Sequence, residues 1–374
     1  MKPIKMVDLQ GQYHKIKNEV DTAIAEVLES TAFINGPAVQ KFQKNLADFL
    51  NVKHVITCGN GTDALMAALI ALDLQPGDEV ITTPFTFIAT VEVICLLKLK
   101  PVFVDIEYDT FNMDMAQIEK VITPRTKVIL PVHLFGQCCN MHVIKSLAEK
   151  YNLFIVEDAC QAMGTDYIRE DGTRQKAGTL GDIGCTSFFP SKNLGCYGDG
   201  GAIFTNSDAL AYKLKGIVNH GMFERYRYEM IGMNSRLDTI QAAVLDIKLR
   251  YLEQYNHSRI EAAQQYNNAF KGYSQMDIPV TSSFSTHIFH QYTLKLKNIN
   301  RENLIKQLQL AEIPVMIYYP YPIHSQEAYA FLGYRKGDFP VSETLAQNVI
   351  SLPIHTELTT EQISYIINNF LSLI

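Results

Sequence analysis

The chain has 374 residues, of which 47% are hydrophobic and 19% charged, and its formal net charge is −6. At roughly 150 residues per domain, this length predicts about two domains, and the composition excludes a disordered chain. An acidic balance without a block of Lys or Arg argues against a nucleic-acid partner.

The cysteines and the apolar runs indicate the compartment. There are seven cysteines, an odd number, and no CxxC pair or recognisable signal peptide. This pattern predicts a reduced, cytoplasmic chain rather than a disulfide scaffold. No run approaches the roughly 20 apolar residues that span a bilayer, so we expect no membrane segment.

Short β-rich runs alternate with helical patterns between about residues 50 and 206. This alternation predicts an α/β domain with a mostly parallel sheet, and continuous apolar runs predict strands covered on both faces. Helices are expected at 62–72 and 141–151. The expected strands are 55–58, 80–83, 102–106, 128–134, 154–156, 185–189 and 202–205.

The pattern changes after Gly232. One long helical pattern runs from residue 237 to about 270, with Leu237, Ile240 and Val244 on one face. We therefore predict a large domain over residues 1–250 and a small C-terminal α+β domain over residues 251–374. The elements expected after the long helix are a strand at 290–296, a helix at 302–310, a strand at 315–319 and two C-terminal helices.

Residues 187–201, SFFPSKNLGCYGDGG, place Lys192 in a turn after a strand. Glycine is favoured where the backbone turns sharply or approaches a ligand. A lysine held there can acquire the lowered pKa that a nucleophilic amine requires, although a solvated lysine is the commoner interpretation of such a turn. These glycines do not form a Walker-type loop, which disfavours a nucleoside triphosphate site.

Two other strand ends carry candidate ligand groups. Strand 154–156 continues into Glu157 and Asp158, and an acid there could pair with a cationic ring nitrogen or could be a surface acid or helix cap. Alternation predicts that only one of the two faces a cleft. Residues 58–65, CGNGTDAL, lead into a helix N-terminus that could bind an anion, with Thr62 adding a hydroxyl. The same residues are also compatible with an ordinary turn without a ligand, in which Thr or Asp is the N-cap of the helix.

Metal and acyl-transfer chemistry are disfavoured. The histidines are isolated and form no HxH or HExxH pattern, so no metal site is expected. Ser187 and Ser191 lack a GxSxG setting, which argues against a catalytic triad.

Four motifs in order resemble the DegT/DnrJ/EryC1/StrS family of nucleotide-sugar aminotransferases. They are GTDAL at 61–65, EDACQA at 157–162, SFFPSKNLGCYGDGG at 187–201 and NSRLD at 234–238. The resemblance covers nearly the whole chain and is strongest to members that aminate UDP-linked 3-keto N-acetylhexosamine uronates. It implies the aspartate aminotransferase-like fold type I of pyridoxal-phosphate (PLP) enzymes. That fold has a large domain with a mostly parallel seven-stranded sheet and a small α+β domain, and works as a homodimer with shared active sites.

The resemblance also implies roles for individual residues. Lys192 matches the lysine that bonds to PLP, Asp158 the carboxylate at the pyridinium nitrogen and Gln161 the residue near the cofactor O3′. The other cofactor contacts that it implies are Gly61, Thr62 and Ser187 at the phosphate, Phe87 stacked on the ring, and Asn234 reaching the phosphate from the partner subunit.

Substrate contacts are expected at Arg236, Tyr318, Tyr319 and His324. Arg236 could meet a carboxylate or pyrophosphate or could hold Asn234 in place, and the tyrosines could line a polar pocket or pack at a domain interface. Two positions depart from the family. Met163 stands where members often have His, and Tyr318-Tyr319 stands where uronate-type members have His-Tyr, which weakens the case for a carboxylate-bearing sugar.

The function implied is transfer of an amino group from L-glutamate to the keto group of a UDP- or dTDP-linked sugar, in amino-sugar or cell-surface polysaccharide biosynthesis. One alternative is a PLP-dependent sugar dehydratase, but related dehydratases replace the lysine with histidine and this chain keeps Lys192. The other is a non-enzymatic regulator, which should show a basic patch or a helix-turn-helix segment if it binds DNA, and neither is visible in the sequence.

Overall fold

The computed structural model describes residues 3–374. Seven strands form its largest sheet: β1 (His54–Cys58), β2 (Glu79–Thr82), β3 (Lys100–Phe103), β4 (Thr126–Ile129), β5 (Phe154–Asp158), β8 (Ile183–Ser187) and β9 (Gly201–Thr205). Their order is β1-β9-β8-β5-β4-β2-β3. β9 is antiparallel to β1 and β8, and the other pairs are parallel. The predicted mostly parallel seven-stranded sheet is confirmed.

Each of the seven apolar runs predicted from the sequence corresponds to one strand of this sheet. The largest difference is in β4, which ends at Ile129 rather than at residue 134. Pro131 has no amide hydrogen to donate to a neighbouring strand, and Phe135 adopts a left-handed backbone with φ 56°. The chain therefore turns away through the short 3-10 helix η1 (Leu134–Gly136).

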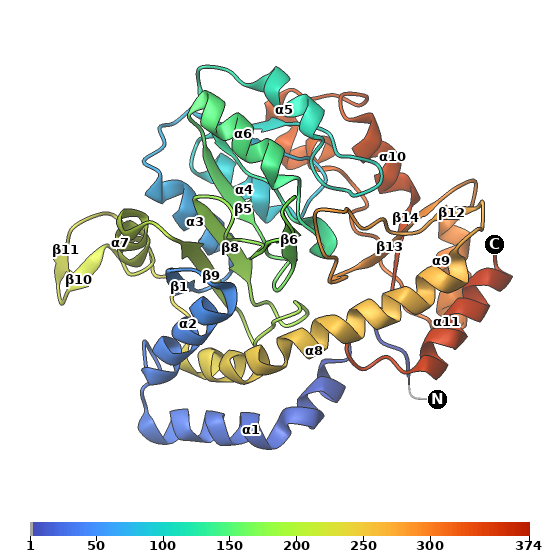
Figure 1. The fold of residues 1–374 in the computed structure, drawn as a ribbon, viewed down its shortest axis with the longest axis horizontal. Helices are drawn as coiled ribbons and strands as arrows, with labels where there is room; N and C mark the ends of the chain where they lie inside the picture. The colour runs from blue at the N-terminus through green and yellow to red at the C-terminus, as the bar shows by residue number, and fades with distance from the viewer. Residues whose placement is uncertain (1–2) are drawn as a thin grey trace.

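Helices cover both faces of the large sheet (Figure 1). They are α3 (Gly61–Ala71), α4 (Ala89–Leu96), α5 (Met115–Val121), α6 (Met141–Tyr151) and α7 (Asp208–Ile217). Successive strand residues enter different cores: Val80 and Val156 pack with α3 and α7, whereas Ile81 and Ile155 pack with α5 and α6. The strands are buried on both faces, as their continuous apolar runs predicted.

One long helix, α8 (Thr239–Phe270), confirms the helical pattern expected from residue 237. Its first half packs against α2 (Pro37–Leu50) and α1 (Leu9–Ser30), which the sequence analysis did not predict. Its second half enters the core of the C-terminal part through Ala263, Tyr266 and Phe270. Figure 1 shows α8 running from below the large sheet to that part. The predicted domain boundary at residue 250 falls within α8 and stays a prediction.

The C-terminal part is built on a three-stranded antiparallel sheet of β12 (Met276–Asp277), β13 (Tyr292–Leu296) and β14 (Val349–Leu352). Its helices are α9 (Arg301–Leu310), α10 (Pro340–Asn348) and α11 (Thr360–Ser372). The strand expected at 290–296, the helix at 302–310 and the two C-terminal helices are confirmed.

The strand predicted at 315–319 is wrong. Only Met316 pairs with a strand, as an isolated bridge to Ser351, and β14 takes the place beside β13. Pro314 and Pro320 enclose this segment and remove amide donors at both ends. All four residues of β14 are buried, whereas Met316 is exposed, so burial favours β14 as the central partner.

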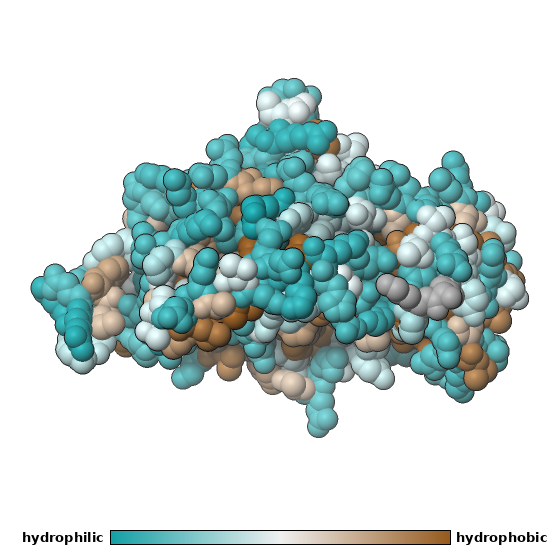
Figure 2. Space-filling model, turned by 90° about the horizontal axis from the view of Figure 1, so that it is seen from below, coloured by the Kyte–Doolittle hydropathy of each residue, from teal (hydrophilic) through white to brown (hydrophobic). Residues whose placement is uncertain are grey.

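Two small hairpins lie outside the main sheets, and neither was predicted. They are β6 (Asp166–Ile168) with β7 (Arg174–Lys176), and β10 (Met222–Glu224) with β11 (Arg227–Tyr228). The 3-10 helices η2 (Ile323–Ser325) and η3 (Glu327–Leu332) precede α10. No helix within residues 3–374 is long and apolar enough to cross a membrane. Seen from below, the surface is mostly hydrophilic with local hydrophobic patches (Figure 2).

Candidate active site

The turn between β1 and α3 packs directly against the end of β8. A Cβ atom added to Gly61 would lie 2.7 Å from Cβ of Ser187 and 3.2 Å from Sγ of Cys160. Any side chain at position 61 would therefore displace the end of β8 or the segment after β5. The structure brings Gly61 and Ser187 together, as the resemblance implied for a shared phosphate site.

The N-terminus of α3 presents free backbone amides beside this contact. Asn60 is the N-cap, and its side chain accepts a hydrogen bond from the amide of Asp63 at 2.8 Å. The cap is thus Asn60 and not the Thr or Asp that the sequence left open. The amides of Gly61 and Thr62 begin the helix and have no acceptor within it. Together with the helix dipole they form a site that suits a phosphate.

The two acids at the end of β5 have separate environments, as alternation predicted. Glu157 is fully buried, and its carboxylate accepts hydrogen bonds from the amides of Gly178, Leu180 and Gly181 at 2.9, 2.6 and 2.5 Å. Its Oε2 also lies 2.7 Å from Nε2 of His133. The three amides hold the loop after β7 in place and His133 holds the segment after β4, so Glu157 is structural.

Asp158 is oriented by two hydrogen bonds. Its Oδ2 accepts from the hydroxyl of Thr90 at 2.8 Å, and its Oδ1 accepts from the amide of Cys160 at 3.2 Å. Thr86 lies within 3.2 Å of the Thr90 hydroxyl and extends this network. The residue as a whole is 5% exposed. A buried carboxylate with a fixed direction is suited to meet a cationic ring nitrogen.

Lys192 lies in the turn after β8, where its amide donates to the carbonyl of Phe189 at 2.8 Å. Burial lowers the pKa of its amine, and the nearby Cys160 and Asp158 offset only part of that shift. A lowered pKa favours the neutral amine, which is the form that attacks a carbonyl. The lysine therefore has the environment of a nucleophile rather than of a solvated surface residue.

Gln161 connects this group to the C-terminal part. Its Oε1 accepts from the amide of Phe135 at 2.9 Å, and its Nε2 donates to the hydroxyl of Tyr319 at 3.0 Å. The ring of Tyr319 packs edge-on against Phe85. Burial raises the pKa values of both Tyr318 and Tyr319, so these phenols stay protonated. The structure thus places Tyr319 at the site, next to Gln161.

Three predicted residues lie toward solvent at the edge of the site. The ring of Phe87 is 57% exposed, Asn234 is exposed and Arg236 is partly exposed. Between the last two, the Ser235 hydroxyl donates to Asp63 at 2.6 Å and accepts from the amide of Gly59 at 2.9 Å. The 234–236 segment is therefore anchored beside the β1–α3 turn with Asn234 accessible.

His324 is the predicted residue that the structure does not bring to this group. Its Nε2 lies 3.1 Å from the Glu343 carboxylate, and its ring packs against Phe339. Its Nδ1 is buried without a partner among the described residues. Met163, where the family often has His, is also buried in an apolar cluster with α2 and α8. A substrate role for His324 stays a prediction.

The sequence analysis assigned no role to Thr90 or His290. Thr90 follows Phe87 by one helical turn in TFIAT (residues 86–90). Only the three-dimensional contact with Asp158 shows its role. His290 was treated as an isolated histidine, but it belongs to a buried network that begins at the residue after Lys192. No local pattern could have identified it, because its side-chain partner, Asn193, is 97 residues away.

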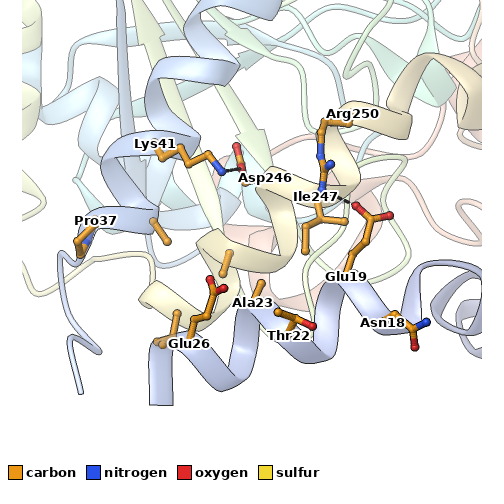
Figure 3. A pocket seen from close by; sticks show the side chains of 13 residues that line it. Asn18, Glu19, Thr22, Ala23, Glu26, Pro37, Lys41, Asp246, Ile247 and Arg250 are labelled. Atoms are coloured by element: carbon orange, nitrogen blue, oxygen red, sulfur yellow. Dashed lines mark hydrogen bonds and ion pairs between the residues drawn. The ribbon is translucent and has the colours of Figure 1, made fainter. Parts of the chain in front are cut away.

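A groove of about 740 Å³ lies elsewhere, between α1, α2 and α8 (Figure 3). Figure 3 shows its two ion pairs, Lys41 with Asp246 and Glu19 with Arg250, at 3.0 and 2.7 Å. None of the predicted site residues lines it. The catalytic chemistry suggested by the sequence is therefore not located in this groove.

Comparisons with known proteins agree with the geometry at the strand ends. A model of the DegT/DnrJ/EryC1/StrS aminotransferase family matches residues 14–371. UDP-2-acetamido-2-deoxy-3-oxo-D-glucuronate aminotransferase from Pseudomonas aeruginosa is 42% identical over 97% of this chain and 98% of its own. UDP-N-acetyl-3-dehydro-alpha-D-glucosamine 3-aminotransferase from Acidithiobacillus ferrooxidans is also 42% identical, over 97% and 96%. A pleiotropic regulatory protein from Geobacillus stearothermophilus is equally similar, at 42% over 97% and 96%.

Two solved structures are similar to this chain over nearly its whole length. The crystal structure of a DegT DnrJ EryC1 StrS aminotransferase from Brucella abortus has a TM-score of 0.93 and 40% identity, covering 99% of both chains. NtdA from Bacillus subtilis, solved with bound cofactor PMP, has a TM-score of 0.91 and 30% identity, covering 100% of this chain and 85% of its own.

Proposed function

Because this chain belongs to the DegT/DnrJ/EryC1/StrS aminotransferase family, we propose that it moves an amino group from L-glutamate to the keto group of a nucleotide-linked sugar. One observation carries the proposal. Three neighbouring segments bring an anion-binding helix N-terminus, the carboxylate of Asp158 and the amine of Lys192 to one place. These are the three groups that pyridoxal 5′-phosphate requires from a protein.

The residues present fit this cofactor. The amides of Gly61 and Thr62, with the Ser187 hydroxyl, would hold the phosphate at a turn too tight for any side chain at position 61. Asp158 would meet the ring nitrogen and Lys192 the carbonyl carbon. When bound, the cofactor supplies an electron-accepting ring and carries the amino group between donor and acceptor.

Side chains of this chain perform the remaining tasks. Thr90 and the Cys160 amide hold the Asp158 carboxylate in one orientation, in which it would meet the ring nitrogen. The Lys192 amine, whose pKa is lowered by burial, would move a proton to and from the carbon that loses or gains the amino group. Gln161, whose Oε1 accepts from the Phe135 amide and whose Nε2 donates to Tyr319, would lie beside the cofactor O3′.

For the acceptor, a UDP-linked 3-keto sugar is the first substrate class to test. Two relatives at 42% identity carry names that specify UDP-linked 3-oxo or 3-dehydro sugars. Arg236 is partly exposed beside the β1–α3 turn, where a guanidinium can meet a pyrophosphate or a carboxylate. Tyr318 replaces the histidine of uronate-type members, which favours a sugar without a carboxylate; dTDP-linked ketosugars are the comparison set.

A homodimer with shared sites is part of this proposal. Several large apolar side chains stand exposed: Phe87 is 57% exposed, Phe189 53% and Ile231 93%. A subunit interface would remove these apolar side chains from water, which stabilises association. Asn234, also exposed, is the residue that we propose to reach the cofactor phosphate in the other subunit.

Purified chain supplied with PLP, L-glutamate and UDP- or dTDP-linked ketosugars tests the function. We expect visible absorbance from the lysine-bound cofactor, release of 2-oxoglutarate and an aminated sugar detected by mass spectrometry. Lys192→Ala should lose all three, while Lys213→Ala, a partly exposed lysine that pairs with Asp73, should keep them. A protein that stays colourless with added PLP would contradict the proposal.

A regulatory role is the second candidate, because one relative of equal similarity is named a pleiotropic regulatory protein. The two roles separate in vivo. If the phenotype of a deletion strain is restored in full by Lys192→Ala, the regulatory role is supported. If it is restored only by the wild-type chain, amino transfer is the function that the cell uses.

A further inference from the structure

The Ser235 hydroxyl bridges the two ends of the turn between β1 and α3. It accepts a hydrogen bond from the amide of Gly59 at 2.9 Å and donates to Oδ2 of Asp63 at 2.6 Å. Gly61 and Thr62, whose amides are proposed to hold the cofactor phosphate, lie between these two contacts in the chain. Ser235 itself comes 172 residues after Asp63, so the bridge joins the turn to a distant segment.

The direction of both hydrogen bonds is fixed by the groups involved. A backbone amide can only donate, so the Ser235 oxygen accepts from Gly59. An ionised carboxylate can only accept, so the single hydroxyl proton of Ser235 goes to Asp63. With this proton committed, Ser235 has no donor left for a phosphate. It can therefore affect a bound phosphate only through the residues that it holds.

Ser235 is held on its own side by the backbone. Its amide donates to the Val218 carbonyl at 3.0 Å, and the neighbouring Asn234 forms a β-bridge with Asn219. Only 1% of Ser235 is exposed. Since the side chain is buried and its backbone is paired, the hydroxyl is a fixed point against which the turn is set.

The turn fits closely around this hydroxyl. A Cβ atom added to Gly59 would lie 3.2 Å from Oδ2 of Asp63 and 3.3 Å from the Ser235 oxygen. The Asp63 amide also donates to the Asn60 side chain at 2.8 Å, so Asp63 is held through both its backbone and its carboxylate. Loss of the Ser235 hydroxyl would leave the Gly59 amide without this acceptor and the Asp63 carboxylate without this donor.

We propose that Ser235 positions the amides of Gly61 and Thr62 for the cofactor phosphate by holding both ends of the turn. This role differs from that of Asn234, which is proposed to reach the phosphate in the other subunit. The inference rests on the proposed phosphate site at this turn. It adds a positioning residue that touches neither the cofactor nor the substrate.

The test compares two cofactor forms in the full chain freed of cofactor, without glutamate or sugar. Pyridoxal 5′-phosphate and pyridoxal share the ring and the aldehyde, but only the first carries a phosphate. Absorbance titration of Ser235→Ala should show PLP affinity reduced about tenfold, equivalent to one hydrogen bond, and pyridoxal affinity changed by less than about twofold. A displacement of Lys192 or Asp158 would weaken both compounds equally. Unchanged PLP affinity, or equal losses for the two compounds, would overturn the proposal.

Ser342→Ala is the matched control. Ser342 is also buried, and its hydroxyl donates to Oδ1 of Asp105 at 2.6 Å. This bond is as short as the one between Ser235 and Asp63, but it lies in α10. PLP affinity in Ser342→Ala should therefore equal that of the wild type. A loss as large as that in Ser235→Ala would show a general effect of destabilisation and would contradict the role of Ser235.

Two variants of Asp63 test the bridge from its other end, which matters if Ser235→Ala does not fold. Asp63→Ala and Asp63→Asn both remove the charge, but only the asparagine oxygen can still accept from Ser235. Asp63→Asn should therefore bind PLP about three- to tenfold more tightly than Asp63→Ala, with equal pyridoxal affinities. If the two variants bind PLP equally, the bridge does not position the turn and the proposal is wrong.

The neighbouring Asn234 needs its own control. In an Asn234→Ala background, Ser235→Ala should still reduce PLP affinity about tenfold, because the two residues act on different sites. If that loss disappears, Ser235 acts by placing Asn234, which argues against the proposal. None of these titrations includes an amino donor or an acceptor sugar, so failure of the proposed amino transfer leaves them unaffected. An error in the phosphate turn itself would appear separately, as unchanged PLP affinity in Gly61→Ala.

Discussion

The strand-end region and the 315–324 segment contribute to the same candidate site in different ways. The strand-end region consists of Gly61, Asp158, Ser187 and Lys192. Its conformation follows from local sequence, because each residue lies at or just after the end of a buried strand, in a turn whose residues determine its geometry. The 315–324 segment reaches the site only through Tyr319, and its conformation depends on β14 and Glu343, which are distant in sequence. The residues proposed to bind the cofactor are therefore easier to predict from the sequence than the residues proposed to bind the sugar.

The largest effect is expected from Asp158 in the strand-end region. Asp158→Asn removes the negative charge at the ring nitrogen, so amino transfer should fall about 10²- to 10³-fold. The variant should still fold, because an amide oxygen can accept from Thr90. Steady-state kinetics with glutamate and a ketosugar give the first result, and thermal unfolding gives the second.

Glu157→Gln is the matched control, one residue away. Its carboxylate holds three backbone amides and His133, so the variant should lose about 3 kcal/mol of stability but keep its turnover within about threefold below its melting temperature. If Glu157→Gln lost activity as strongly as Asp158→Asn, the assignment of the two acids to separate roles would be wrong.

Gly61→Ala should have the next largest effect. The added methyl group would lie 2.7 Å from Ser187 Cβ, so the phosphate turn must shift, and a displacement of about 1 Å can cost about 10²-fold. Weaker PLP binding should appear in an absorbance titration. Gly172→Ala lies in the β6–β7 hairpin with nothing within 4 Å of the added group, and it should leave PLP binding unchanged. Equal PLP affinity in Gly61→Ala and wild type would exclude the predicted phosphate turn.

Tyr319→Phe tests the one connection between the two regions. Removing the hydroxyl leaves the Gln161 amide without its acceptor, so turnover should fall about tenfold, equivalent to one hydrogen bond. If the hydroxyl acts through Gln161, the double variant Tyr319→Phe with Gln161→Ala should lose no more than Gln161→Ala alone. Additive losses would show that Tyr319 acts directly on a ligand.

The sequence predicted a mostly parallel sheet and where its strands fall along the chain, because continuous apolar runs and glycine turns are local signals. It did not predict the order of the strands within the sheet. It could also indicate that only one of Glu157 and Asp158 faces the site, because strand side chains alternate. It could not indicate that Asn60 caps α3, that Thr90 orients Asp158, or that His290 contacts Asn193, the residue after Lys192. These depend on packing between segments tens of residues apart.

The same limit explains the wrong strand at 315–319. The apolar residues of 315–319 are typical of a strand. The neighbour of β13, however, is β14 (Val349–Leu352), and all four residues of β14 are buried. Met316 lies at the other edge of β14 and pairs with it only through Ser351. How far such an edge pairing extends depends on the fit to β14 and cannot be read from the segment alone.

The smallest effect on catalysis is expected at His324. The family resemblance implies that His324 contacts the substrate, whereas in the structure its ring lies against Glu343 and Phe339. The Glu343 carboxylate accepts from the Gly337 amide at 2.7 Å and lies 3.1 Å from His324. His324→Gln should therefore lower stability by about 1 to 2 kcal/mol and change turnover and KM by less than threefold. Glu343→Gln should give a similar loss. A tenfold rise in the KM for the ketosugar, with unchanged stability, would instead show that His324 contacts the substrate.

The pH dependence of the His324 variant sharpens this test. Burial alone would raise the pKa of Glu343, but hydrogen bonds from the Gly337 amide and His324 lower it below its ordinary value. A carboxyl whose pKa is lowered on folding stabilises the protein above its unfolded pKa and loses that contribution as the pH falls. The difference in melting temperature between wild type and His324→Gln should therefore be largest near pH 7 and shrink below about pH 4. A difference that stayed constant down to pH 3 would show that the ionised Glu343 is not what His324 stabilises.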